Sequence, residues 1–266
     1  MDLKEKEKKL REIANSVFEY PESQEELNYL LRNLNLTKKE VISAYLKYDM
    51  DITSYENEIY ESLAMRMVLY LHYLLKRSWH QDRQNSILKM VEKANPKSIV
   101  DMGFGAPTKY LKEYVLPKKK KIVLVDLYES AFEFSTALFD YLEGDWKKFI
   151  SFRKIDMNTH EYPGDFDCYI FQDSIEHVQD SGRYLSKIVK QSPENSKFIF
   201  SLPIGPLMEC HTIFWDSEKE ASQWLNGCGL KIIELENVYT NKEVDLFTEQ
   251  IEEEFYNLVV LCEKKV

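Results

Sequence analysis

The segment Ile99-Val100-Asp101-Met102-Gly103-Phe104-Gly105 consists of a short apolar run that ends in a G-x-G turn. Its short apolar run predicts a strand from Ser98 to Met102 that is buried on both faces. The two glycines behind it predict a tight turn in which the backbone can approach a ligand closely. Open α/β sheets bind ligands beyond the carboxyl ends of their strands, which is where this turn lies. A G-x-G turn occurs in many proteins, so its meaning depends on the surrounding sequence.

Strands and helices alternate after Pro96, which predicts a sheet with helices on its faces. Helical stretches separate the first five strands, so those strands are expected to be parallel. A polar segment joins the last two and favours a hairpin-like return with an antiparallel last strand. The predicted strands are Ser98 to Met102, Lys121 to Asp126, Ser151 to Asp156, Asp167 to Phe171, Lys197 to Leu202, Leu230 to Val238 and Phe255 to Glu263.

The first 95 residues have a helical pattern with few strand signals. Thr37 and Glu40 have the spacing of a capping box, and Ser54 can cap the long fourth helix. We therefore predict a helical region over 1–95 and an α/β domain over 96–266. The predicted helices are Leu3 to Phe18, Gln24 to Leu34, Lys38 to Tyr48, Tyr55 to Arg77 and Gln81 to Lys93.

Composition excludes several classes of protein. The net charge of -10 argues against nucleic acid as a partner, because affinity for phosphates needs a basic surface. The four cysteines show no Cys-x-x-Cys spacing, so neither a disulfide framework nor a zinc site is indicated. The most apolar helical stretch is interrupted by Arg66 and His72 and is too short to span a bilayer. With no signal-peptide pattern at its start, the chain is predicted to be cytoplasmic and not membrane-bound.

Two further strands end in carboxylates. Asp126 follows an apolar strand and could accept hydrogen bonds from both hydroxyls of a ribose. The alternative for Asp126 is an ordinary helix cap or turn residue. The next strand ends at Asp156 and Met157, where the carboxylate could receive an adenine amino group and the methionine could cover the ring. The sequence therefore favours an adenosyl ligand.

The series V-D-M-G-F-G, V-L-V-D-L, I-D-M and F-D-C-Y-I-F-Q-D-S-I-E-H-V resembles successive motifs of class I S-adenosylmethionine-dependent methyltransferases. The resemblance covers the chain from about Pro96 onward. It implies that family's Rossmann-like seven-stranded sheet and S-adenosylmethionine as the cofactor. It also implies that the helices over 1–95 act as a lid, a substrate-binding part or a homodimer contact. The cofactor-binding residues that it implies are Asp101, Gly103, Phe104 and Gly105 in the methionine-side loop, Asp126 and Leu127 at the ribose, Asp156 and Met157 at the adenine, and Asp173 near the methionine portion.

Two residues near the turn depart from known patterns. The family often has another glycine where this chain has Pro107, so the loop is expected to run differently. The dinucleotide pattern G-x-G-x-x-G needs glycine where this chain has Thr108, which disfavours NAD.

Methyl transfer is an in-line displacement, and a base is needed when the nucleophile carries a proton. The candidate catalytic residues are His177, in the family's E-H pair, and Glu209 and His211, which follow the fifth strand. The alternative is that they are polar loop residues. No two of His160, His177 and His211 show helical or hairpin ligand spacing, so no metal site is predicted.

The function that these features favour is S-adenosylmethionine-dependent methyl transfer to an oxygen, nitrogen or carbon atom of a small molecule, in cofactor or secondary-metabolite biosynthesis. Two other functions stay open. A non-catalytic protein of the same fold could bind the adenosyl ligand. Pro107, which replaces a glycine that is frequent in the family, keeps this function open. An NAD-dependent oxidoreductase fits less well because of Thr108.

Overall fold

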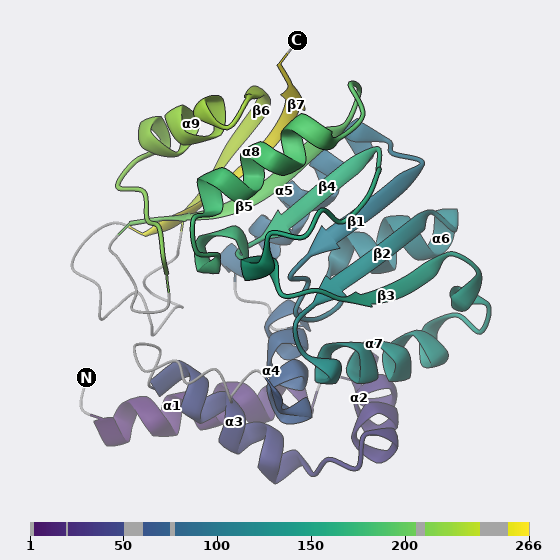
Figure 1. Cartoon of the computed structure of the whole chain (residues 1–266). Helices are drawn as coiled ribbons and strands as arrows, with labels where there is room; N and C mark the ends of the chain where they lie inside the picture. Colours follow the sequence, from purple (N-terminus) through teal and green to yellow (C-terminus); the bar gives the residue numbers. More distant parts are fainter. Residues whose placement is uncertain are drawn as a thin grey trace.

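The computed structural model of the protein describes residues 3–19, 21–50, 61–74, 78–205, 211–239 and 255–265. Within these residues, seven strands form one sheet in the order β3-β2-β1-β4-β5-β7-β6 (Figure 1). The pairs among β1 to β5 are parallel, and β7 runs antiparallel to both of its neighbours. The predicted fold is confirmed. The strands are β1 (Ser98–Met102), β2 (Lys121–Asp126), β3 (Ile150–Lys154), β4 (Cys168–Gln172), β5 (Lys197–Ile204), β6 (Leu230–Tyr239) and β7 (Tyr256–Lys264).

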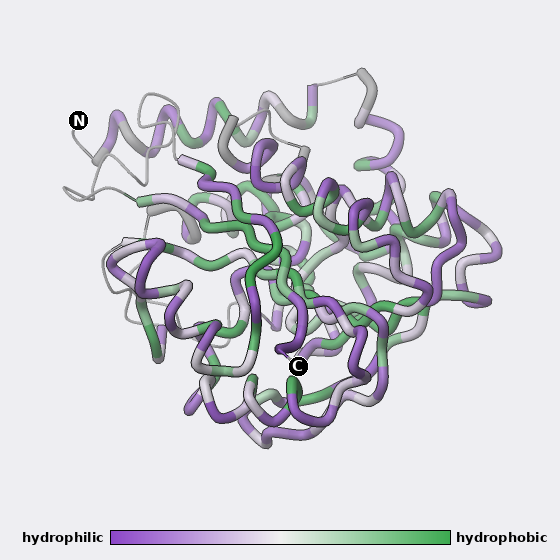
Figure 2. Tube along the Cα trace, turned by 90° about the horizontal axis from the view of Figure 1, so that it is seen from above, coloured by the Kyte–Doolittle hydropathy of each residue, from purple (hydrophilic) through white to green (hydrophobic). Residues whose placement is uncertain are grey.

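Helices cover both faces of this sheet. Successive strand residues point to opposite sides, so each face carries apolar side chains that pack against helices. Ile99 belongs to a core cluster with α5 (Ser78–Ala94), α7 (Glu129–Leu142) and the π-helical turn Leu111–Val115 that leads into α6 (Leu116–Lys118). Val100 belongs to a second cluster with α8 (Ser181–Gln191) and α9 (Glu218–Gly227). Figure 1 shows α8 and α9 on one side of the sheet and α5 on the other. The hydrophobic stretches lie mainly in the interior of the trace (Figure 2).

The remaining helices are α1 (Leu3–Val17), α2 (Pro21–Asn33), α3 (Lys38–Met50) and α4 (Leu63–Leu74). They share a third core cluster with Phe134 and Leu138 of α7, so the helical region is packed onto the α/β domain. Helix α5 packs against β5, β6 and β7. It therefore belongs to the sheet layers, although the boundary predicted at residue 95 placed it with the helical region.

All five predicted helices are present, but some of their starts differ from the prediction. Helices α2 and α5 begin three residues earlier than predicted, and α4 begins at Leu63, so Glu61 and Ser62 precede it. The predicted capping box is also present: Thr37 N donates to Glu40 Oε2 at 2.7 Å, and Glu40 N donates to Thr37 Oγ1 at 3.2 Å. Ser54 lies outside the described residues, and Ser62 Oγ accepts from Met65 N at the start of α4. Among the described residues no helix has the length and hydropathy needed to cross a membrane.

Candidate functional site

The turn after β1 lies where the ends of three strands meet. Gly103 and Gly105 have φ angles of +74° and +64°, which side-chain-bearing residues rarely adopt. Gly103 N donates to Val125 O at 2.8 Å, which ties the turn to β2. A Cβ at Gly103 would lie 2.8 Å from Ser174 Cβ and 3.1 Å from Met157 Cε. Only glycine fits, and the turn brings the ends of β1, β3 and β4 into contact.

Asp126, at the end of β2, is buried and accepts three hydrogen bonds. Its Oδ2 accepts from Gly105 N at 3.1 Å, and its Oδ1 accepts from Tyr128 N at 3.0 Å and from Arg66 Nη2 at 3.2 Å. Arg66, only 2% exposed, also donates to Gly105 O and Ser130 Oγ, both at 3.1 Å. A ribose at this position would therefore share Asp126 with an arginine of α4. The sequence signal for this partner was a single arginine within an apolar helix.

Phe104 points away from the strand ends. Its side chain is 4% exposed, and its ring stacks on Phe132 and Phe152 with centroids 6.2 and 6.4 Å apart. The hydrophobic side chain has more apolar contact in this core than at a polar turn. The predicted cofactor contact of Phe104 stays a prediction, and with the ring in the core only its backbone is placed to make it.

Asp101 supports the turn from within the core. Its carboxylate is fully buried, and Oδ2 accepts from Tyr110 Oη at 2.6 Å and from Gln172 Nε2 at 2.9 Å. Burial raises the pKa of Asp101 to about 7, although both hydrogen bonds oppose the shift. The side chain therefore holds β1 against β4, and its predicted contact with a cofactor stays a prediction.

An apolar side chain and a carboxylate border the turn on the β2–β3 side. Leu127, directly after β2, is 40% exposed. Asp156 caps the short turn after β3, where its Oδ1 accepts from Asn158 N at 2.9 Å. Met157 packs against Gly103. The arrangement leaves apolar surface and a carboxylate where a flat heterocycle could lie.

Asp173, directly after β4, joins three elements. Its Oδ1 accepts from Ser201 Oγ at 2.7 Å and from Asn257 Nδ2 at 2.9 Å, and its Oδ2 is paired with Arg83 of α5. Asp173 has a φ of +44°, and Asn257 is 1% exposed. Asp173 was predicted from the sequence, whereas its pairing with Ser201, Asn257 and Arg83 was not.

Two of the predicted catalytic residues, His177 and His211, lie together with Glu176. Glu176 and His177 follow β4, and His211 follows β5. The two imidazole rings have centroids 4.9 Å apart at an interplanar angle of 80°. Thr212 fixes this approach, because its N and Oγ1 both donate to Glu176 O, at 2.8 and 3.0 Å. Glu209 lies outside the described residues.

Burial shifts the pKa values of both His211 and Glu176 away from their usual ranges. Burial, and then the charge of His177, lowers the pKa of His211 to about 4, so its imidazole is neutral but weakly basic at neutral pH. Burial, and then the charge of Asp173, raises the pKa of Glu176 well above its usual range. His160 lies elsewhere, with Nε2 2.8 Å from Gln179 O and its ring stacked on Tyr184.

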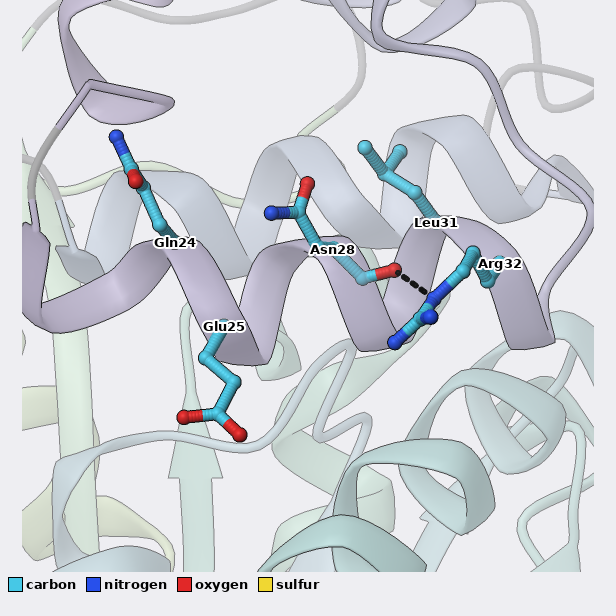
Figure 3. A pocket seen from close by; sticks show the side chains of 5 residues that line it. All are labelled: Gln24, Glu25, Asn28, Leu31 and Arg32. Atoms are coloured by element: carbon cyan, nitrogen blue, oxygen red, sulfur yellow. Dashed lines mark hydrogen bonds between the residues drawn. The ribbon is translucent and has the colours of Figure 1, made fainter.

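A shallow hollow on α2 is separate from this site (Figure 3). None of its lining residues comes from a loop at the carboxyl end of a strand, and Arg32 within it donates to Asn28 O at 3.2 Å. They are Gln24, Glu25, Asn28, Leu31 and Arg32.

Comparison with known proteins supports the same fold. No protein-family model and no curated protein sequence matches the chain significantly. Solved structures do match. They include the [4+2]-cyclase SpnF (11% identity, 72% of this chain and 84% of that one, TM-score 0.56), Synechocystis magnesium protoporphyrin IX methyltransferase (13%, 74% and 87%, 0.52) and Burkholderia thailandensis 1,6-didemethyltoxoflavin-N1-methyltransferase (17%, 80% and 92%, 0.52).

The last two of these structures contain S-adenosylhomocysteine. The chain thus has the fold of class I S-adenosylmethionine-dependent methyltransferases. A fold alone does not determine an activity, so the function has to be argued from the site.

Proposed function

We propose that this protein is an S-adenosylmethionine-dependent methyltransferase that acts on a small molecule. The observation that carries the proposal is the meeting of a glycine turn with strand-end carboxylates at one edge of the sheet. Asp126 ends β2, while Asp156 and Asp173 follow β3 and β4. Gly103 packs directly against Met157 and Ser174, the residues after the last two of these carboxylates. Ligands of open α/β sheets bind at this edge.

The residues present fit this cofactor. S-adenosylmethionine carries a sulfonium and an ammonium group, and carboxylates favour such a cation. Asp126 would accept from the ribose hydroxyls, Asp156 and Met157 would bind the adenine beside the exposed Leu127, and Asp173 would orient the amino-acid portion. The backbone of Gly103 and Gly105 would line the loop. When bound, the cofactor supplies an electrophilic methyl group.

Arg66 has a defined part in this proposal. It holds Oδ1 of Asp126 while Gly105 N holds Oδ2, so the carboxylate has one orientation before any ligand arrives. Ordering the carboxylate in advance reduces the entropy lost on binding. Ribose hydroxyls would add to these bonds or displace the guanidinium.

The substrate would approach from β4 and β5, where His177 and His211 lie. A substrate with an acidic proton would need an acceptor there, and Glu209, His177 and His211 are the candidates. A base works best when its pKa is near the working pH, and the pKa of His211, about 4, lies well below neutral pH. Its neutral nitrogen is better suited to orient a donor than to take up a proton. The net charge of -10 disfavours a nucleic-acid substrate.

A second candidate function is binding of an adenosyl ligand without methyl transfer. One observation favours it: a solved structure of similar fold is that of a [4+2]-cyclase, a name that does not refer to methyl transfer. Both functions predict binding of S-adenosylhomocysteine. Only the first predicts its formation from S-adenosylmethionine in the presence of an acceptor molecule.

Isothermal titration calorimetry with S-adenosylhomocysteine and with NAD tests the proposal. We expect S-adenosylhomocysteine to bind, NAD to bind at least tenfold more weakly, and Asp126→Asn to weaken S-adenosylhomocysteine about tenfold, because hydrogen bonds to a charged group contribute about 1.5–3 kcal/mol. Asp145→Asn is the matched control, since Asp145 is an exposed carboxylate paired with nearby Lys148. Wild-type affinity in Asp126→Asn would refute the assignment of Asp126 to the ribose.

A further inference from the structure

We propose that Glu176, His177 and His211 form a binding site for one divalent transition-metal ion. One carboxylate oxygen and one nitrogen from each imidazole all lie within 4.8 Å of one another. Ligands bonded to one ion at roughly 2.1 Å stand roughly 3–4 Å apart. Side-chain rotations that move these ligand atoms by about an ångström would therefore bring them around one ion.

The carboxylate of Glu176 supplies an independent observation. The residue has no exposed surface, and neither Oε1 nor Oε2 has a hydrogen-bond partner among the described residues. Buried polar groups are almost always paired, because an unpaired one loses its hydration without compensation. A cation held between this carboxylate and two imidazoles would provide the missing partner.

The backbone holds the ligands in place from two separate loops. Thr212 donates from N to Glu176 O, and its Oγ1 lies 3.0 Å from Glu176 O and 2.7 Å from Val178 O. These bonds fasten His211 to the turn that carries Glu176 and His177. Sequence spacing alone predicted no metal site, because the ligands meet only through this contact between loops.

The ligand set selects the kind of ion. Imidazole and carboxylate suit zinc, iron(II), cobalt(II) and manganese(II), whereas magnesium prefers oxygen ligands. Three protein ligands leave coordination positions open, as in catalytic sites. If the proposed function holds, those positions lie on the substrate side of β4 and β5, and the substrate is a molecule that presents a metal-binding oxygen or nitrogen.

Metal titration of the full-length protein tests the site. The protein is treated with EDTA and then titrated with Co²⁺, Zn²⁺ and Mg²⁺, by calorimetry and, for Co²⁺, by visible absorption. We expect one equivalent of Co²⁺ or Zn²⁺, at least about a hundredfold weaker binding of Mg²⁺, and about a hundredfold loss of Co²⁺ affinity in His211→Ala and in Glu176→Gln. His160→Ala is the matched control, because His160 lies outside the group, and it is expected to bind like the wild type.

Wild-type Co²⁺ affinity in His211→Ala would overturn the proposal, as would the absence of Co²⁺ binding by the wild type. Glu176→Gln keeps the buried shape and tests the charge; should it fail to fold, His211→Ala decides. S-adenosylhomocysteine is titrated into the same samples. Metal binding without S-adenosylhomocysteine binding would overturn the proposed function and uphold the metal site.

Discussion

Arg66 and Asp126 stand 60 residues apart in the chain and form an ion pair whose side chains are 2% and 7% exposed. Buried pairs of this kind contribute little net stability, because both charges lose their hydration, but removing one partner leaves the other charge unpaired. The pair therefore connects helix α4 to the end of β2, where the ribose is proposed to bind. Replacing either residue therefore leaves the buried charge of the other without its partner.

Arg66→Met should lower the free energy of unfolding by about 3 kcal/mol, because Asp126 keeps its charge and two backbone donors but loses the guanidinium. Urea denaturation monitored by circular dichroism measures the loss. The double variant with Asp126→Asn should recover part of it, which gives the coupling energy of the pair. Arg183→Met, at a surface arginine with a 79% exposed side chain, should change stability by less than about 0.5 kcal/mol. Equal losses in both arginine variants would contradict the buried pairing.

Gly103→Ala should destabilise the protein by about 2 kcal/mol, since the new Cβ would meet Ser174 and Met157 at a positive φ. The same variant should bind S-adenosylhomocysteine at least tenfold more weakly. Gly144→Ala is the control, because nothing lies within 4 Å of its Cβ position. The melting temperatures of the two variants, measured side by side, check the difference. If Gly103→Ala kept wild-type stability, the turn would have space for a Cβ at this position and the prediction would be wrong.

Asp101 should make stability fall as pH rises. Its pKa is raised from 3.8 in the unfolded chain to about 7 in the fold, so the folded state binds a proton more tightly. The resulting stabilisation is full below about pH 4 and is lost as pH approaches 7, at up to about 1.4 kcal/mol per pH unit. Asp101→Asn removes this dependence and can still accept from Tyr110 and Gln172. Urea denaturation at pH 5 and pH 8 should show the variant gaining on the wild type at pH 8; a constant difference would refute the shift.

Thr212→Val should weaken Co²⁺ binding about tenfold, as changes just outside the ligands of a metal site commonly do. The variant loses the hydroxyl that bonds to Glu176 O and Val178 O and keeps the backbone bond. Calorimetry of the metal-free protein gives the measurement. Thr159→Val, which removes an exposed hydroxyl bonded to Asp156 O, is the control. Unchanged Co²⁺ affinity in Thr212→Val would mean that the hydroxyl does not position His211.

The sequence was a good guide to the fold because the central strands are buried on both faces. Such strands need nearly continuous apolar residues, as in β1 and β2, and their ends lay within two residues of prediction. Strand ends also located Asp126 and Asp173, because the carboxyl ends of parallel strands meet at one edge. These positions depend on local pattern and topology, which the sequence displays directly.

The partners of these residues could not be predicted in the same way. Asn257 reaches Asp173 across 84 residues and Arg66 reaches Asp126 across 60, with no periodic pattern to mark either pair. Phe104 stands in the predicted loop, yet its ring lies in the core, because backbone direction within a turn decides where a side chain points. The approach of His211 to Glu176 likewise depends on hydrogen bonds between two loops. Long-range packing, not local preference, completes the site.

The order of strands in the sheet has a consequence for synthesis of the chain. Strand β6 has one neighbour, β7, and β7 also pairs with β5. A growing chain makes β6 before β7, so the edge of β5 and the whole of β6 stay unpaired until the later strand leaves the ribosome. Unpaired edges of this kind attract other chains during folding. We therefore expect the nascent protein to be prone to aggregation during the interval in which β6 is made and β7 is not.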